Sequence, residues 1–108
     1  MDILRRRERH RANKANAIQR AREFIALYFA THPCVDCGKT DPMILTFDHV
    51  RGEKRDKVAD MVLKGLSVAA IAEEITKCDV VCFNCHSLRT QQRAGAYRWR
   101  MGKLGRQL

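Results

Sequence analysis

The sequence predicts a small α+β domain in which helices surround a short β-sheet and a metal ion joins distant segments. Three observations predict this class. The chain has 108 residues, which is enough for one domain with a thin hydrophobic core. Two short β-type runs stand among helix-like segments. Four of the five cysteines form two C-x-x-C pairs, a pattern that small domains use to hold a stabilising metal.

Residues 1–31 are predicted to form one long basic helix. Between Arg5 and Ala30 there is no Gly or Pro, and Ala, Arg and Gln are frequent. Apolar residues recur with helical spacing only in the second half, at Ile18, Ala21, Ile25, Tyr28 and Phe29. The first half lacks an apolar face, so we expect it to fray unless it lies along a polyanion. Pro33 limits the helix on its C-terminal side.

Residues 32–92 are predicted to form the core of the domain, with two strands and two short helices between the cysteine pairs. The first strand is expected at residues 44–47, ending at Asp48 and His49, and the second at residues 79–81. A short helix should begin near Val58 and end at Gly65. Ser67 is a suitable N-cap for the next helix.

The C-terminal part is predicted to be helical over residues 87–100 and weakened at Gly95. The last residues contain Gly102 and Gly105 and are expected to be loose. Residues 93–108 therefore form a basic tail in this interpretation. The whole chain, residues 1–108, is expected to be a single domain.

The net charge of +9 is concentrated at the two ends of the chain. Residues 1–24 contain eight Lys and Arg against three acidic residues, and residues 86–108 contain six and none. Residues 25–85 contain seven against nine. Basic ends rich in Arg are typical of proteins that bind phosphate groups, so we expect DNA as the partner. The simpler alternative is a pair of solvated basic tails.

The sequence does not predict a membrane protein or an exported one. No stretch approaches the roughly 20 apolar residues that a membrane helix needs. The N-terminal residues are basic and polar and lack the apolar segment of a secretory signal. We therefore expect a soluble cytoplasmic protein, in which thiols stay reduced and available to metals.

Cys34, Cys37, Cys82 and Cys85 are the predicted ligands of a structural zinc ion. Either pair alone is equally compatible with a redox dithiol or with ordinary buried cysteines. Residues 82–86 also fit the C-x-x-C-H pattern of haem attachment, but that chemistry needs export and leaves the first pair unexplained. Cys78 is expected to pack as a small apolar residue.

A four-cysteine site would bring residues 82–86 beside residues 34–49, so that Asp48, His49 and His86 meet. One carboxylate and two imidazoles suit phosphodiester hydrolysis, in which one histidine deprotonates water while the other groups hold a divalent ion. The simpler alternative is that these residues only cap a strand and a cysteine turn. His10 and His32 are expected to be surface or capping residues.

Taken in order, these motifs strongly resemble the HNH endonucleases, especially small bacterial and phage members. The resemblance covers about residues 20–92 and is carried by C-x-x-C-G at 34–38, LTFDHV at 45–50, GEK at 52–54 and ITKCDVVCFNCH at 75–86. It implies a ββα-metal fold, also called a His-Me finger, in which two strands and a helix surround one catalytic ion. It also implies a bacterial cell or a phage as the setting.

The resemblance assigns roles to individual residues. His49 becomes the general base, Asp48 and His86 become ligands of a catalytic Mg²⁺ or Mn²⁺, and the four cysteines hold zinc. The family's middle Asn has Asn84 as its candidate here, although many members carry that Asn further upstream, where this chain has residues 74–77. The candidate phosphate contacts are Arg51, Lys54, Arg89 and Arg93. The implied function is metal-dependent cleavage of DNA, and the alternative is a non-catalytic, zinc-stabilised module that binds nucleic acid.

Overall fold

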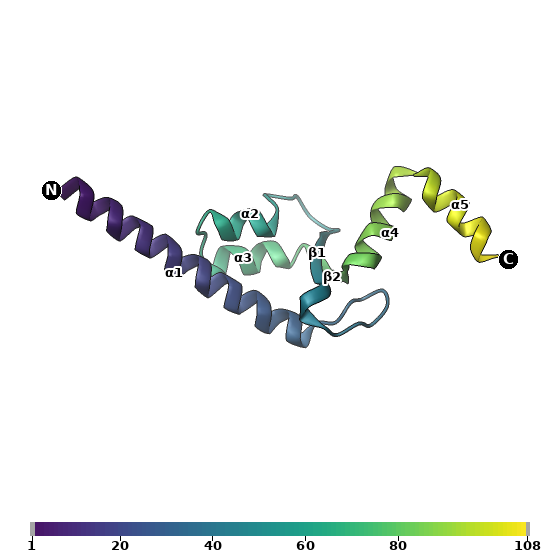
Figure 1. The fold of residues 1–108 in the computed structure, drawn as a ribbon, viewed down its shortest axis with the longest axis horizontal. Helices are drawn as coiled ribbons and strands as arrows, with labels where there is room; N and C mark the ends of the chain where they lie inside the picture. The colour runs from purple at the N-terminus through teal and green to yellow at the C-terminus, as the bar shows by residue number, and fades with distance from the viewer. Residues whose placement is uncertain (1, 108) are drawn as a thin grey trace.

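The computed structural model describes residues 2–107 and has the predicted α+β class (Figure 1). Within this range the chain forms five α-helices, one short 3₁₀ helix and one antiparallel pair of strands. In order these are α1 (Asp2–Thr31), η1 (Pro42–Ile44), β1 (Leu45–His49), α2 (Val58–Leu63), α3 (Val68–Ile75), β2 (Cys78–Cys82), α4 (Phe83–Ala94) and α5 (Tyr97–Arg106). The molecule is elongated, with extents of 70 × 27 × 23 Å.

Helix α1 covers the predicted range, and its first half is more regular than the sequence predicted. Its second half packs on the core through the fully buried Ala21 and the neighbouring Ile18, Phe24, Ile25 and Tyr28. Residues 2–16 are exposed but helical, so the expected fraying is absent from this part of the structure. Because helix propagation is easy once a turn is formed, the packed half can carry a segment of good helix formers with it. Figure 1 shows the N-terminal half of α1 extending away from the other elements.

Helices α2 and α3 lie against the second half of α1 and complete the first hydrophobic cluster. Helix α2 ends before Gly65, as predicted. The predicted N-cap of α3 is confirmed, because the Ser67 hydroxyl accepts a hydrogen bond from the Ala70 N–H at 3.1 Å. Met61 and Ile71 are fully buried between the three helices. This cluster therefore holds α3 at a fixed position relative to α1.

The strands β1 and β2 pair in antiparallel register, with Leu45 opposite Cys82 and His49 opposite Cys78. Both strands lie where the sequence predicted them, within one or two residues. Helix α4 follows β2 without a loop and packs on both strands. The register therefore brings the start of β1 beside the second cysteine pair, and the end of β1 beside the end of α3.

A second hydrophobic cluster joins the cysteine turn, the sheet and α4. It is formed by Cys34, Leu45, Val80, Val81, Cys82 and Cys85. The aromatic ring of Phe47 packs against both clusters, with its centroid 4.7 Å from that of Phe29 and 5.9 Å from that of Tyr28. The sheet is thus attached to α1 through aromatic contacts.

The predicted helix over residues 87–100 is two helices. Helix α4 ends at Gly95, which adopts a left-handed conformation with φ of +60° and donates its N–H to the carbonyl of Gln92 at 3.1 Å. Helix α5 continues to Arg106, so the expected loose tail is helical instead. Its Lys103 amine lies over the Trp99 ring, 5.2 Å from the centroid, a contact that supports the helical turn.

Within residues 2–107, no helix combines the length and the apolar character needed to cross a bilayer.

We expect Met61→Ala to lower the free energy of unfolding by about 2–5 kcal/mol, because it leaves a cavity among three helices. Leu63→Ala is the matched control on the same helix. Leu63 is 55% exposed, so its truncation should cost about 0.5 kcal/mol or less. Urea titration of the metal-loaded protein measures both. Equal losses for the two variants would contradict the described core.

Candidate metal centre and adjoining cleft

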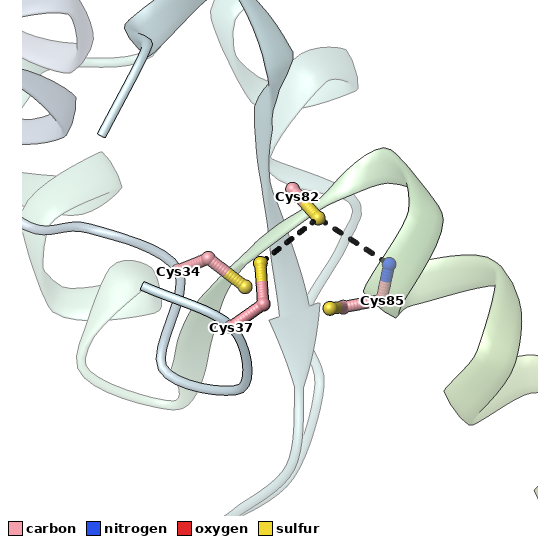
Figure 2. Close-up of side chains that lie close together, drawn as sticks. All are labelled: Cys34, Cys37, Cys82 and Cys85. Carbon is pink, nitrogen blue, oxygen red and sulfur yellow. Dashed lines mark hydrogen bonds between the residues drawn. The ribbon is translucent and has the colours of Figure 1, made fainter. Parts of the chain in front are cut away.

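Four cysteines converge from two segments that are distant in the chain (Figure 2). Their sulfur atoms all lie within 4.8 Å of one another, and those of Cys37 and Cys82 are 3.7 Å apart. In a tetrahedral thiolate site, metal–sulfur bonds of about 2.3 Å place the sulfur atoms about 3.8 Å apart. All five cysteines of the chain are free thiols rather than disulfides. The cluster could therefore hold a metal ion such as zinc.

Backbone hydrogen bonds form the turn that presents the first cysteine pair. Gly38 adopts a positive φ of +79° and donates its N–H to the carbonyl of Cys34 at 2.9 Å, which closes the turn. The Val35 N–H donates to the Val80 carbonyl at 2.9 Å and so attaches the turn to β2. On the other side, the Cys85 N–H donates to the sulfur of Cys82 at 3.4 Å, at the first turn of α4. Both pairs are thus held by regular local structure.

The thiol pKa values differ strongly within the cluster. Burial acts to raise the pKa of Cys34, but backbone N–H groups, that of Cys82 foremost, lower it to about 6. Burial and the neighbouring sulfur atoms raise the pKa of Cys85. Four thiolates cannot share so small a volume without a positive charge to offset their repulsion. The donor set and its electrostatics therefore fit a metal ion.

Cys78 lies apart from this cluster. It is buried in the first hydrophobic cluster beside α3, and burial raises the pKa of its thiol to about 11. The prediction that Cys78 packs as a small apolar residue is confirmed.

Asp48 is buried on β1, and both of its carboxylate oxygens accept hydrogen bonds from α4. Arg93 donates to Oδ1 and to Oδ2 at 2.7 Å each, and Arg89 donates to Oδ2 at 2.8 Å. The Arg93 hydrogen bonds lower the pKa of Asp48 most, against the opposing effect of burial, and with Arg89 they bring it to about 2. The carboxylate is therefore ionised, and two guanidinium groups offset its charge.

Arg89 connects three parts of the site. It donates to Asp36 in the cysteine turn through Nε and Nη2, at 2.7 Å each, and to Asp79 on β2 through Nη1 at 3.1 Å. All three guanidinium nitrogens therefore engage carboxylates. This observation gives Arg89 a structural role, and its predicted contact with DNA stays a prediction.

His86 lies on α4, next to Asp48. Its Nε2 is 3.9 Å from Oδ1 of Asp48, and its side chain is 41% exposed. Two ligand atoms that each lie about 2.1 Å from one ion can be up to about 4.2 Å apart. Adjacent ligand atoms of an octahedral ion lie about 3.0 Å apart, so these two groups would have to move closer together to share a divalent ion. Within residues 2–107, the four cysteines are the one group of at least three such donors close enough to share an ion.

His49 ends β1 and faces a different set of partners. Its Nε2 forms a hydrogen bond of 2.9 Å with Oε2 of Glu74, a buried residue of α3. Successive residues of a strand point to opposite sides, so Asp48 reaches α4 while His49 reaches α3. The separate partners of these two neighbours follow from this alternation.

A cleft of about 940 Å³ runs along β1, and Asp48, His49 and His86 all line it. The basic residues on its wall are Arg51, Lys54, Lys57 and Arg93. Asn84 is exposed on the first turn of α4 and is not among the lining residues. Its catalytic role stays a prediction. The structure therefore brings the acidic residue and two imidazoles to one basic cleft.

The remaining histidines lie away from this cleft. His10 is exposed on α1. His32 follows α1, where its Nδ1 lies 2.8 Å from the Tyr28 carbonyl and its ring stacks on that of Tyr28 with centroids 3.7 Å apart. The prediction that both are surface or capping residues is confirmed.

Sequence reasoning missed Glu74 as the partner of His49. One signal could have identified it: Glu74 stands between Ile71 and Ile75 on the apolar face of α3, where an acidic residue must have a buried partner. Asp36 and Asp79 were also missed, because their common contact with Arg89 depends on the tertiary fold.

Comparison of the chain with protein-family models, with curated proteins and with solved structures found no match.

We expect Cys85→Ala to lose the bound metal and to unfold at a markedly lower temperature, because three thiols cannot complete the tetrahedral set. Cys78→Ala should retain about one ion per chain, since Cys78 lies outside the set. Elemental analysis of the purified variants and thermal unfolding measure both effects. Metal retained by Cys85→Ala, or lost by Cys78→Ala, would contradict the four-cysteine centre.

Proposed function

We propose that this chain is a metal-dependent endonuclease of the HNH type that hydrolyses DNA phosphodiester bonds. The single observation that carries the proposal is that Asp48, His49 and His86 all line one cleft with basic residues on its wall. The arrangement of β1, β2 and α4 is consistent with the ββα-metal fold that the sequence resemblance implies. We further propose that the cysteines hold Zn²⁺, which favours tetrahedral thiolate sites.

The residues of the cleft have the chemistry that hydrolysis requires. A divalent ion, Mg²⁺ or Mn²⁺, held by Asp48 and His86 would stabilise the negative charge that develops on the phosphate. The neutral imidazole of His49 takes a proton from a water molecule whose oxygen attacks phosphorus. The bond from phosphorus to the 3′ oxygen breaks, and that oxygen takes a proton from solvent. The products are 5′-phosphate and 3′-hydroxyl ends.

Basic side chains around the cleft and on both terminal helices would bind the DNA backbone. Arg51, Lys54 and Arg93 line the cleft itself, and of these Arg51 is paired with Asp79 and Arg93 with Asp48. The exposed half of α1 carries five Arg and one Lys, and α5 carries three Arg and one Lys without an acidic residue. These charges supply a sequence-independent attraction for phosphate. Contacts to bases are not needed for this part of the proposal.

A second candidate function is non-catalytic binding of nucleic acid. It is favoured by the two arginines that engage Asp48, because they offset the carboxylate charge without a divalent ion. A phosphate group could then approach the basic cleft without repulsion from Asp48. The two candidates differ in whether His49 is needed for chemistry.

We expect His49→Ala to retain its metal and its fold but to nick supercoiled plasmid at least about 100-fold more slowly than wild type, because the general base is lost. His10→Ala is the matched control, since it removes an exposed histidine from α1. It should nick at the wild-type rate in Mg²⁺ or Mn²⁺. Equal nicking by wild type and His49→Ala would refute the assignment of the base, and an inactive wild type would favour the binding module.

DNA binding should weaken steeply with added salt, because basic side chains displace counterions from phosphate. The association constant K falls as salt is added, so a plot of log K against log salt concentration has a negative slope. Replacing Arg6 and Arg9 in the exposed half of α1 with Gln should make this slope less steep by about 2. Fluorescence anisotropy with a labelled duplex measures this slope.

Lys64→Gln is the control for this titration, because the Lys64 ammonium is already paired with Asp56 at 2.7 Å. It should leave the slope unchanged. A slope that does not respond to the Arg6 and Arg9 replacements would exclude α1 from the DNA interface.

A further inference from the structure

Glu74 places a carboxylate where an apolar residue would be expected. Its side chain is 2% exposed and lies on the core-facing side of α3, between Ile71 and Ile75. A buried carboxylate is strongly disfavoured unless hydrogen bonds satisfy its oxygens. Its position behind His49, a residue that lines the cleft, therefore calls for an explanation beyond packing.

Three donors converge on this carboxylate. The Lys77 ammonium donates to Oε1 at 2.9 Å, and the Arg55 N–H donates to Oε2 at 3.0 Å. The third partner is Nε2 of His49, 2.9 Å from Oε2. Burial acts to raise the pKa of Glu74, but these hydrogen bonds, led by that of Lys77, lower it to about 2. An ionised carboxylate only accepts hydrogen bonds. Nε2 of His49 must therefore carry a hydrogen and donate the hydrogen bond to Glu74.

The hydrogen bond to Glu74 determines which ring nitrogen of His49 is free. A neutral imidazole has one N–H donor and one acceptor nitrogen, so a protonated Nε2 leaves Nδ1 as the acceptor. Among residues 2–107, no side chain or backbone group bonds to Nδ1, and Nδ1 is not a buried unsatisfied atom. Nδ1 is therefore open to solvent, on a residue that lines the cleft.

We infer that Glu74 is the positioning residue of the general base: it holds His49 in the Nε2–H tautomer, with Nδ1 as the acceptor for a proton from water in the cleft. The inference rests on the proposed function, because it assigns His49 the role of base. It adds that the carboxylate acts through the imidazole and does not itself touch the phosphate.

A purely structural role for Glu74 is the competing explanation. Through Arg55 and Lys77 the carboxylate also attaches the loop after β1 to α3, and Lys77 donates in addition to the Glu53 carbonyl at 2.7 Å. Loss of these bonds alone would lower stability without changing the tautomer of His49. A measurement of the His49 tautomer therefore separates the two explanations.

The deciding measurement is the tautomer of His49, read from long-range ¹H–¹⁵N spectra of the zinc-loaded protein without added Mg²⁺. The His49 signals are assigned by their absence in His49→Ala. We expect the Nε2–H tautomer in wild type and a mixture of both tautomers in Glu74→Gln, because a neutral amide can either accept from or donate to the ring. In plasmid nicking, Glu74→Gln should lower kcat by about 10²–10⁴-fold and change KM little.

Lys77→Met is the matched control. It removes the other side-chain hydrogen bond to Glu74 and keeps the carboxylate beside His49. We expect this variant to lose thermal stability to a similar extent as Glu74→Gln, while it keeps the Nε2–H tautomer. Its kcat should stay within about threefold of wild type.

The outcomes separate this inference from the proposed function. An Nδ1–H tautomer in wild type overturns the inference, and this spectrum does not depend on whether Glu74→Gln folds. The inference is also overturned if Glu74→Gln and Lys77→Met show the same His49 tautomer and the same kcat. A wild type that shows the Nε2–H tautomer but no cleavage of any DNA refutes the nuclease instead, and leaves Glu74 as the partner that orients His49.

Discussion

The closure of the chain by four cysteines is the constraint on which the rest of this structure depends. Cys37 and Cys82 are 45 positions apart, yet their sulfur atoms lie 3.7 Å from each other. Closing a loop of that length costs conformational entropy, and a metal ion bound to both ends can offset this cost. The closure also aligns β1 with β2 and starts α4 at the cysteine cluster. The cleft along β1 is lined in part by the first residues of α4, which this closure positions.

Two buried carboxylates lie on opposite sides of β1 and have different hydrogen-bond partners. Asp48 is satisfied by arginines of α4, and Glu74 is satisfied by Lys77, by the Arg55 backbone and by His49. Both carboxylates are ionised, since these donors lower the pKa of each to about 2. The first lies next to His86, and the guanidinium groups of Arg89 and Arg93 offset its charge. The second orients an imidazole. Neighbouring strand residues thus serve different partners because a strand alternates its side chains.

Much of the fold could be predicted from local patterns. The helical spacing of apolar residues in α1, the Ser67 cap of α3 and the apolar runs of both strands are local signals, and the structure confirms each of them. The predictions that were wrong concern the two ends of the chain. The exposed half of α1 and the segment after Gly95 are helical where fraying and a loose tail were expected, because helices propagate from packed or capped neighbours.

The sequence by itself determined the chemical inventory: two cysteine pairs with metal-ligand spacing, an acidic residue next to a histidine at a strand end, and basic termini. Those features depend on residue type and spacing, which can be read without a fold. Only the tertiary structure decided which charges meet. The bonds of Asp48 with Arg89 and Arg93, and of His49 with Glu74, join residues between 25 and 45 positions apart. Such contacts follow from strand register and helix packing, and side-chain periodicity within one element does not specify them.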